Sequence, residues 1–434
     1  MKRKIQKNCT RLGSDLSYVD FVQTSSGVFR IGSAPEISKW LVKYHLKYDY
    51  VIMPEPHVTT MGDNYTGEEF IIWNQIHFHN SEPVRYIGYL KDLMYLTKRL
   101  HLTIDQKFNK TQTRIEPVLR IPKLCHLMPL AGSEIHIGKT NIVFSGNNIE
   151  IFDNNSLVYS YMNLSPHKNV AFETENLIAP FLKNLEPSEN LKIFVLGNGN
   201  GFKYKTSNFL VRFGERVIWI DVGAYPFQLL AKHKFHPDIV TDYIITHNHE
   251  DHWEGFTAIL QRAVETHSII NLLTTQKIFN TLKKQIGFLF PDFDQIVKLE
   301  RLTPNEPLPY FKSVITARLN HHPLRQGVLG LKFEFNEICF GISGDTLYNE
   351  QLIEKLKREE LTYKFFKKCD LLFHEVEFKN PNTVHSYYKE VEKLSKKIKG
   401  KLFVYHTHIR KKLLPLAKEG YWYSIEKNKI KITK

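Results

Sequence analysis

Residues 247–252 concentrate metal-binding side chains in a way that few loops do. They read His-Asn-His-Glu-Asp-His and directly follow an apolar run that ends at Thr246. Alternate residues of an extended chain point to the same side, so His247 and His249 can hold one metal ion. Asp251 and His252 turn the other way and can begin a second site. The spacing therefore predicts two adjoining metal sites at the end of a strand.

This motif and its surroundings resemble the metallo-β-lactamase fold superfamily, an αββα sandwich with metal ions held by its loops. Further motifs follow in the order that the resemblance implies. Asp221, at the end of "VIWID", matches an aspartate that orients a metal-binding histidine through a hydrogen bond. Asp345, in "GISGDT", matches the carboxylate that bridges the two ions.

Two motifs leave a choice of ligand. "LNHHP" offers His321 and His322, and we favour His322 because a proline follows it. "VYHTH" offers His406 and His408, and we favour His406 because it ends the apolar run. The ligands that the resemblance implies are therefore His247, His249, Asp251, His252, His322, Asp345 and His406.

Other stretches resemble the RNase Z-like phosphodiesterase branch of the superfamily. "VLGNGNGFKYKTSNFLV" places a Gly-rich turn, with Gly197, Gly199 and Gly201, after the first strand. "DLLFHEVEF" and "TVHSYYKEVEKL" are similar to the branch's His-Glu and His-Ser motifs, which contribute Glu375 and His385. The β-lactam and thioester hydrolases of the fold lack this pair. The resemblance covers residues 190 to 410 approximately.

The chemistry that the resemblance implies is phosphodiester hydrolysis. Two divalent ions would clamp the phosphate and supply a hydroxide near neutral pH, which Asp251 would orient. His385 would meet charge on the phosphate and protonate the leaving alkoxide, while Glu375 keeps His385 protonated and oriented. Histidine-rich ligation without thiolates favours zinc, although manganese or iron would accept the same ligands.

The pattern of strands and helices predicts an α/β chain with two domains. A polar segment, Leu182 to Lys192, is the expected linker between an N-terminal α/β domain (1–185) and the hydrolase domain (190–434). "KIFVLG" and "KLFVYHTH" are expected strands, and "NFLVRFGERVIWIDVG" is an expected hairpin. "TVHSYYKEVEKLSKKIKG" is an expected helix with Ser386 as its N-cap and Gly400 past its end.

Three short stretches of the first half are similar to stretches of the second, in the same order. "VFRIGS" pairs with "VIWIDVG", "YDYVIMPEP" with "DYIITHNHE", and "IVFSGNN" with "CFGISGDT". The members of each pair lie about 190 to 200 residues apart, and a nearly constant offset of this kind is typical of a duplicated unit. The residues Pro54-Glu55-Pro56 would then stand in place of the first metal-binding histidines. The N-terminal domain would be a metal-free, degenerate copy of the hydrolase fold.

Composition limits the partners and the compartment. The net charge of +14 and the pI of 9.3 fit RNA or polyphosphate ligands. They also fit the high lysine content that an AT-rich genome gives its proteins. No apolar run approaches the roughly 20 residues of a membrane span, and the basic N-terminus lacks an apolar region behind it. The four scattered cysteines are typical of reduced thiols. We expect a cytoplasmic protein without a membrane partner.

The expected function is RNase Z-like cleavage of RNA, of the tRNA 3′-processing type. A cyclic or other small nucleotide is the alternative substrate, because the Gly-rich loop lacks the arginine of tRNA-processing enzymes and we find no Gly/Pro-rich arm. Two further functions stay open: a binding module in the N-terminal half with a regulatory hydrolase, and hydrolysis of another ester, such as a lactone or thioester. The resemblance also leaves a homodimer open.

Overall fold

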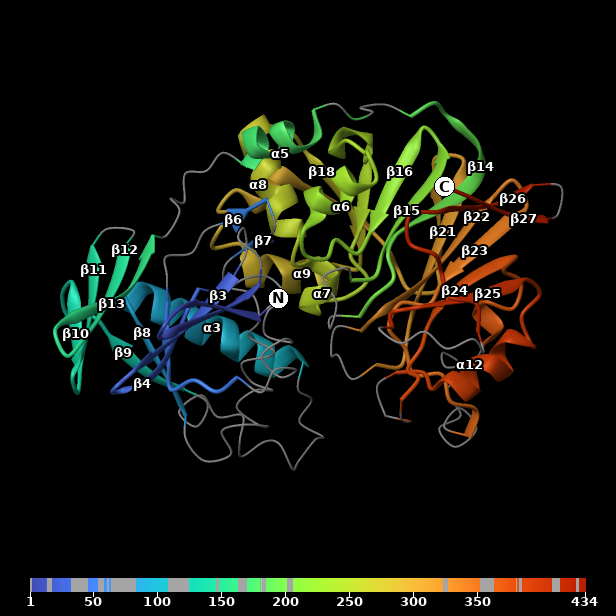
Figure 1. Cartoon of the computed structure of the whole chain (residues 1–434). Coiled ribbons are helices and arrows are strands. Elements are labelled where there is room, and N and C mark those ends of the chain that lie inside the picture. The colour runs from blue at the N-terminus through green and yellow to red at the C-terminus, as the bar shows by residue number, and fades with distance from the viewer. Residues whose placement is uncertain are drawn as a thin grey trace. The chain divides into compact units, whose positions relative to one another are not determined.

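The computed structural model forms two compact units, unit 1 (Met1–Glu173) and unit 2 (Thr174–Lys434) (Figure 1). All four cysteines are buried and free. Among the residues described, no helix has both the length and the apolar character that a bilayer span requires. The described residues are 2–13, 18–32, 46–53, 58–60, 62–63, 83–107, 125–145, 148–162, 170–179, 181, 185–200, 206–322, 327–351, 363–379, 381, 385–407, 414–426 and 429–434.

Unit 2 begins with a mixed sheet of eight strands, ordered β19-β18-β17-β16-β15-β14-β26-β27. The expected hairpin is confirmed, since β15 and β16 are antiparallel and joined at Gly214. The next pairs, β16 to β19, are all parallel. The strands are β14 (Ser188–Gly197), β15 (Asn208–Gly214), β16 (Arg216–Ile220), β17 (Asp242–Ile244), β18 (Ile270–Thr274), β19 (Val297–Arg301), β26 (Trp422–Glu426) and β27 (Lys429–Thr433).

A second sheet of six strands runs in chain order from β20 to β25. Aromatic side chains join the inner faces of the two sheets. The Phe209 ring lies 5.5 Å from Phe373 and 5.0 Å from Tyr405, and Phe213 lies 5.8 Å from Phe335. The strands are β20 (Pro307–Tyr310), β21 (Ser313–Leu319), β22 (Leu329–Phe335), β23 (Ile338–Ile342), β24 (Leu371–Glu375) and β25 (Lys401–Tyr405).

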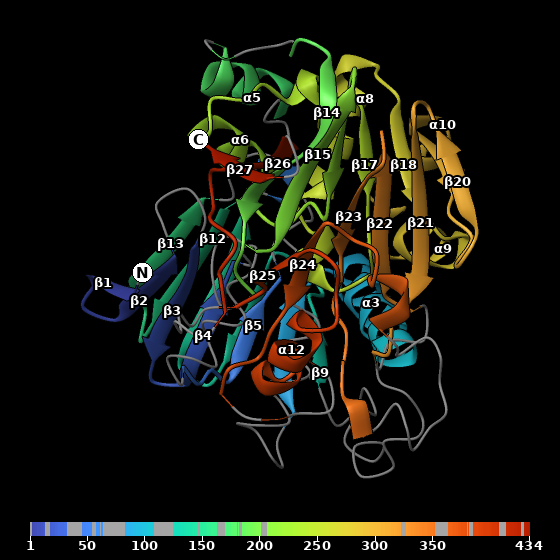
Figure 2. The ribbon, with the colours of Figure 1, turned by 90° about the vertical axis from the view of Figure 1, so that its right-hand side faces the viewer.

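Helices cover the outer faces of this sandwich (Figure 2). On the first sheet, Phe256 of α8 contacts Tyr243 of β17, with 5.8 Å between ring centroids. On the second, Val391 and Leu394 of α12 join a buried cluster with Leu402 of β25. Unit 2 is thus an αββα sandwich, the layer order that the resemblance implied. The helix α5 (Val170–Ile178) spans the boundary between the two units. The helices within unit 2 are α6 (Pro226–Lys232), α7 (Glu250–Trp253), α8 (Phe256–Thr266), α9 (Gln276–Ile286), α10 (Phe293–Ile296) and α12 (Tyr388–Ser395).

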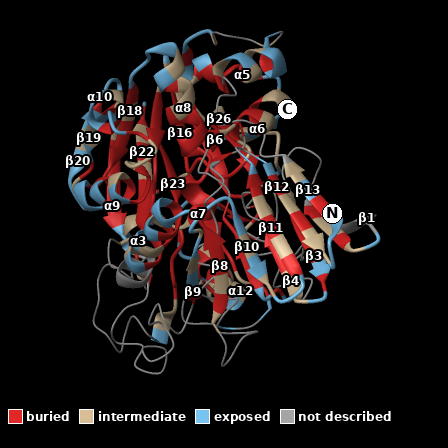
Figure 3. Ribbon diagram, turned by 90° about the vertical axis from the view of Figure 1, so that its left-hand side faces the viewer, coloured by how far each residue is buried: buried red, intermediate tan, exposed pale blue. Residues whose placement is uncertain are grey.

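Burial follows the layers of unit 2. In Figure 3 its central strands are largely buried, and exposed residues gather on the helices and turns. The strand β16 illustrates this, because every residue after Arg216 is buried, as a strand covered on both faces requires.

Three local predictions were wrong. The strand β14 already begins at Ser188, inside the segment expected to be the linker. The helix α12 begins at Tyr388, with Tyr387 as its N-cap, so Ser386 does not cap it. The Ser386 hydroxyl is used in tertiary hydrogen bonds instead. The helix ends at Ser395, well before Gly400. A Cβ atom built onto Gly400 would lie 1.9 Å from the carbonyl oxygen of Asp370.

Unit 1 also contains two main sheets. One has seven strands, β1-β2-β3-β4-β5-β8-β9, and the other has four, β10 to β13. Phe29, Ile31 and Ile52 of the first sheet share one core with Ile142 and Ile151 of the second. The elements are β1 (Lys2–Gln6), β2 (Cys9–Gly13), β3 (Tyr18–Thr24), β4 (Gly27–Ile31), β5 (Tyr50–Ile52), β6 (Val58–Thr59), β7 (Gly62–Asp63), β8 (Val84–Gly88), α3 (Leu90–Lys107), β9 (Cys125–Pro129), β10 (Glu134–Ile137), β11 (Thr140–Ser145), β12 (Asn148–Asp153) and β13 (Ser156–Met162).

The order of strand directions in unit 2 recurs in unit 1. From β2 to β9 the successive pairs are antiparallel twice and then parallel three times. The pairs from β14 to β19 have the same directions. By this order β4 corresponds to β16 and β5 to β17, as two of the sequence matches predicted. The third match fails, because β11 corresponds to β21 rather than to β23.

The register of these strands identifies equivalent residues. Ile31 pairs with Ile52 in unit 1, as Ile220 pairs with Ile244 in unit 2. The next residue is Gly32 in unit 1 and Asp221 in unit 2, and both have a positive φ, 82° and 57°. Residues 54–56, expected to replace the metal-binding histidines, lie outside the described residues. In the described part of unit 1, no strand corresponds to β24 or β25.

Candidate metal centre

Asp221 and Thr246 orient two histidines of the centre. Asp221 accepts hydrogen bonds from the Thr246 backbone N–H and hydroxyl, each at 2.8 Å, and from His252 Nδ1 at 2.8 Å. Because the Thr246 hydroxyl donates to Asp221, it accepts from His247 Nδ1, 2.9 Å away. Both imidazoles therefore turn Nε2 towards the centre. This is the arrangement that a metal-binding histidine needs.

The alternation predicted for the loop after β17 is present. His247 and His249 point to the same side, with Nε2 of the first 3.0 Å from Nδ1 of the second. Asn248, between them, points the other way and donates to Gln285 of α9 at 3.3 Å. The loop then continues into α7, which contains Asp251 and His252. The segment from the end of β17 to α7 thus presents four polar side chains, which are His247, His249, Asp251 and His252.

The second sheet supplies the remaining side chains. Asp345 follows β23 and His406 follows β25, each from the turn at the strand end. His322 follows β21, and its ring lies 5.0 Å from His249. The neighbouring His321 is in none of the possible metal-binding groups of the described residues. His408 lies outside the described residues.

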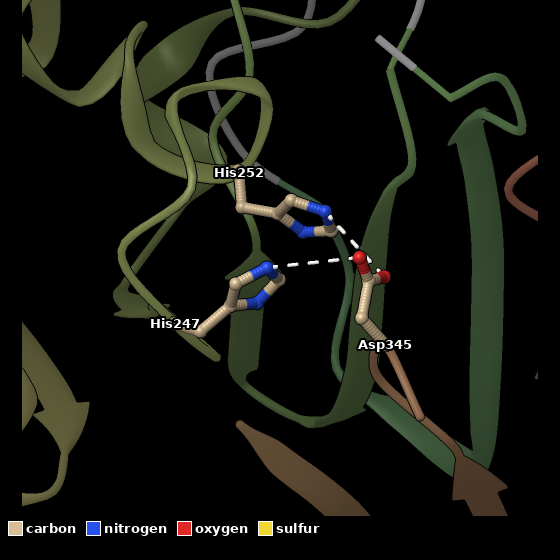
Figure 4. A group of neighbouring side chains, drawn as sticks. All are labelled: His247, His252 and Asp345. Carbon is tan, nitrogen blue, oxygen red and sulfur yellow. Dashed lines mark ion pairs between the residues drawn. The ribbon is translucent and has the colours of Figure 1, made fainter. Parts of the chain in front are cut away.

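The ligand atoms fall into four overlapping groups, each within 4.8 Å. Asp345 belongs to three of them, the position that a bridging carboxylate would have. His247 Nε2 lies 3.7 Å from Asp345 Oδ2, and His252 Nε2 lies 3.6 Å from Oδ1 (Figure 4). The groups are His247 with His252 and Asp345; His249 with His322 and Asp345; Asp251 with His252 and His406; and Asp345 with His385 and His406.

The buried polar atoms at this centre fit a metal. Both ring nitrogens of His322 and Nε2 of His252 and His406 have no hydrogen-bond partner, and neither has Oδ1 of Asp345. Buried polar groups are rarely left in this state, because each such group costs about 1–3 kcal/mol. Imidazole nitrogens and carboxylate oxygens are donors that zinc accepts. The chain therefore brings together a donor set with open positions for divalent ions.

The pKa values of the buried histidines also indicate a site that favours cations. Burial and neighbouring histidines hold the pKa of His247 well below its usual range. Burial, followed by the charge of His385, lowers the pKa of His322 to about 3. Burial would also lower the pKa of His252, but Asp345, Asp221 and Asp251 outweigh it and raise it to about 9. The carboxylates thus attract protons to the positions that a metal would take.

Glu375 and His385 form an ion pair beside these groups. His385 Nδ1 lies 2.6 Å from Oε2 of Glu375, which is fully buried, while the His385 side chain is 27% exposed. Burial would raise the pKa of Glu375, but His385 and His406 hold it well below its usual range. Burial would lower the pKa of His385, but the Glu375 charge outweighs it and raises the pKa. The pair therefore favours an imidazolium whose Nδ1 is held by Glu375.

The pair lies close enough to act on a group held at the centre. The ring of His385 is 5.4 Å from that of His406 and 5.9 Å from that of His322. Glu375 Oε2 is 3.6 Å from His406 Nδ1, so one carboxylate contacts both the acid candidate and a ligand candidate. His406 itself has a φ of 56°, an uncommon conformation for histidine that turns the chain at the end of β25.

Every predicted site residue thus lies in this one cluster. The sequence did not reveal Thr246, which orients His247. It gave Ser386 only as a helix cap and as part of the His-Ser motif, and the contacts of Ser386 are described below. Thr246 immediately precedes the first motif, so a search for a polar side chain at that position could have found it. The Gly-rich turn is described only at Gly197 and Gly199, because Gly201 lies outside the described residues.

A model of the family described as "Anti-Pycsar protein Apyc1" matches residues 191–422, more than half of the chain. The chain belongs to this family. The Apyc1 match spans all the side chains of the cluster. No curated protein matches the chain.

Several solved structures resemble the chain at low identity. The metallo-β-lactamase fold protein YhfI from Bacillus subtilis is 18% identical, with a TM-score of 0.45 over 54% of this chain and 99% of its own. The short form of human tRNase Z (ELAC1) is 16% identical, with a TM-score of 0.42 over 53% of this chain and 98% of its own. A long-form RNase Z from yeast is 15% identical, with a TM-score of 0.41 over 94% of this chain and 69% of its own.

Proposed function

We propose that unit 2 is a metal-dependent phosphodiesterase that hydrolyses a cyclic nucleotide. The observation that carries the proposal is the Glu375–His385 pair beside the histidine and carboxylate cluster. An alkoxide is a poor leaving group and needs a proton as it departs. A thiolate, with an ordinary pKa of about 8.5, leaves without one. The pair therefore favours a phosphodiester over a thioester.

The first ion would be held by His247, His249 and His322, and the second by Asp251, His252 and His406, with Asp345 between them. When bound, two divalent ions would supply positive charge for the phosphate and a hydroxide at neutral pH. Asp251 would orient the attacking oxygen, since its Oδ2 lies near both His252 and His406, at 3.9 and 3.6 Å. We propose zinc for both positions, on the strength of the histidine-rich donor set.

His385 would complete the reaction. As the phosphorus–oxygen bond breaks, its electron pair stays on the leaving oxygen, which takes the Nε2 proton of His385. Glu375 holds Nδ1 and favours the charged ring before transfer. A cyclic 3′,5′-diester would open to a phosphate monoester with one free hydroxyl, and water would supply the new oxygen on phosphorus.

The family match gives the tRNA substrate no support. The family is described as an anti-Pycsar protein, which does not name a tRNA-processing enzyme. The net charge of +14 favours RNA as the second candidate, because phosphate backbones attract basic surfaces. The two substrates would meet the same reacting groups, so only an assay of both separates them.

The test compares hydrolysis of four 3′,5′-cyclic mononucleotides with cleavage of a precursor tRNA that has a 3′ trailer. The protein is loaded with zinc or with manganese. The blank is Asp251→Ala, and the matched control is Asp294→Ala, which removes an exposed carboxylate of α10. We expect turnover of a cyclic nucleotide that only Asp251→Ala abolishes. Trailer cleavage with no cyclic-nucleotide turnover would make RNA the substrate, and no hydrolysis of either would contradict the proposal.

We also propose that unit 1 is a copy of the fold that binds no metal. Gly32 cannot orient a histidine as Asp221 does, and no described strand of unit 1 replaces β24 or β25. Metal analysis of the whole chain should give about two ions, as expected for one dinuclear site. A content near four ions per chain would contradict this proposal.

A further inference from the structure

Ser386 joins two segments of the site. Its side chain is fully buried, one residue after His385. The hydroxyl donates to the Thr346 carbonyl at 2.7 Å and accepts from the Tyr348 backbone N–H at 2.8 Å. Both partners belong to the turn that follows Asp345. The hydroxyl therefore connects the segment that holds the proposed acid to the turn that holds the proposed bridging carboxylate.

Glu375 makes a second connection between the same segments. Its Oε1 accepts a hydrogen bond from the Thr346 N–H at 2.5 Å, while Oε2 holds His385 Nδ1. Thr346 is thus bound at both its N–H and its carbonyl, by Glu375 and Ser386. The contacts form a closed ring that runs from Thr346 through Glu375, His385 and Ser386 and back to Thr346.

The backbone around Ser386 is fixed as well. Its carbonyl accepts from the Glu377 N–H at 2.9 Å, and the Glu377 carbonyl accepts from the Tyr388 N–H at 3.0 Å. The main chain at Ser386 is thereby tied to the end of β24, and its side chain to the turn after β23. A side chain fixed in this way sets the position of its neighbour, His385.

We propose that Ser386 is a positioning residue that holds His385 at the correct distance from Asp345 for proton donation. The inference rests on the phosphodiesterase function proposed above. Proton transfer needs the donor within hydrogen-bond reach of the leaving oxygen. A small displacement of a reacting group can cost about 100-fold in rate. Glu375 sets the orientation of the His385 imidazole, and Ser386 sets the position of the His385 ring.

The experiment uses two phosphodiesters that differ in their need for an acid. A cyclic nucleotide releases an alkoxide, whereas bis(4-nitrophenyl) phosphate releases a stable nitrophenolate. The variants are Ser386→Ala and Ser386→Thr, the second of which keeps a hydroxyl. The matched control is Ser313→Ala, which removes a buried hydroxyl that donates to the Tyr310 carbonyl at 3.0 Å in the turn between β20 and β21.

We expect Ser386→Ala to lower kcat on the cyclic nucleotide by about 10- to 100-fold, as weakened acid catalysis would. On the nitrophenyl ester it should lower kcat by less than about threefold, because that leaving group needs no proton. Metal content should stay unchanged. Ser386→Thr should recover most of the difference between the two substrates, and Ser313→Ala should show none.

Other outcomes would overturn the inference. Equal losses on both substrates, or a loss of metal, would mean that Ser386 only supports Asp345 or the fold. Unchanged kcat on the cyclic nucleotide would mean that Glu375 alone positions His385. If the unaltered protein hydrolyses neither ester, the proposed function and this inference fall together. If it hydrolyses both esters and Ser386→Ala hydrolyses them at the same rates, only the inference falls.

Discussion

Each unit contains a buried aspartate held by an arginine and a tyrosine. In unit 1, Asp20 accepts two hydrogen bonds from Arg11, at 2.7 and 2.6 Å, and one from the Tyr159 hydroxyl at 2.6 Å. In unit 2, Asp242 accepts from Arg216 and from the Tyr310 hydroxyl. Each triad joins strands of the two sheets in its unit.

The metal centre of unit 2 is built differently. Asp345 is as deeply buried as Asp20, yet its Oδ1 has no hydrogen-bond partner, and the same holds for both nitrogens of His322. A polar cluster that stabilises a fold satisfies its own donors and acceptors, whereas a cluster suited to a cation leaves acceptors open. The two kinds of cluster should therefore respond in opposite ways when their carboxylate is removed.

The largest effect is expected at Asp345. Replacing it in Asp345→Ala removes the one carboxylate that three of the four groups share. Hydrolysis should fall by about 10³-fold or more, the scale on which electrostatic groups of active sites act, and elemental analysis should show lost metal. The metal-free variant should unfold at a temperature no lower than the metal-free parent. A variant that keeps both metal and activity would remove Asp345 from the centre.

The fold of unit 1 should depend on Asp20. The change Asp20→Ala leaves the partly buried Arg11 and the buried Tyr159 hydroxyl without their acceptor. Breaking a buried ion pair in this way costs about 3–5 kcal/mol of the free energy of unfolding. Calorimetry of the metal-free protein would measure the loss. If it stays below about 1 kcal/mol, the level of a surface ion pair, the contrast between the two clusters does not hold.

Metal affinity should rise with pH. The pKa of His252 is raised to about 9 and that of His406 is raised too, so a metal must displace protons from both. At a pH below the pKa of such a histidine, each displaced proton makes the metal affinity rise about tenfold per pH unit. Chelator competition at pH 6.5, 7.5 and 8.5 would measure this gain. A constant affinity over that range would show that these rings are already neutral.

A smaller effect is expected from Thr246→Val, which keeps the shape of the side chain and removes its hydroxyl. His247 Nδ1 then loses its acceptor, and its ring is free to turn. Loss of such an outer hydrogen bond weakens metal binding by about 10- to 100-fold. The same chelator assay at one pH measures it, with Thr241→Val as a control at the start of β17. An unchanged affinity would mean that packing alone orients His247.

The sequence predicted the parts of the site that depend on local spacing. His247 to His252 lie together in the chain, and Asp345 and His406 follow apolar runs, so strand ends could be recognised for each. Ser386 could not be assigned, because its partners lie 40 and 38 residues away and a serine before a helix resembles an N-cap. The sequence matches showed only part of the similarity between the two units, because strand directions recur where side chains differ.

The ligand candidates come from both layers of the sandwich. His247 to His252 follow β17 of the first sheet, whereas His322, Asp345 and His406 follow strands of the second. Bound ions would therefore act as a cross-link between the two sheets, in addition to the aromatic contacts and the Asp242 triad that already join them. At free metal 100-fold above the dissociation constant, binding would add about 2.7 kcal/mol to the free energy of unfolding. Metal supply would then change the fraction of folded protein as well as its activity.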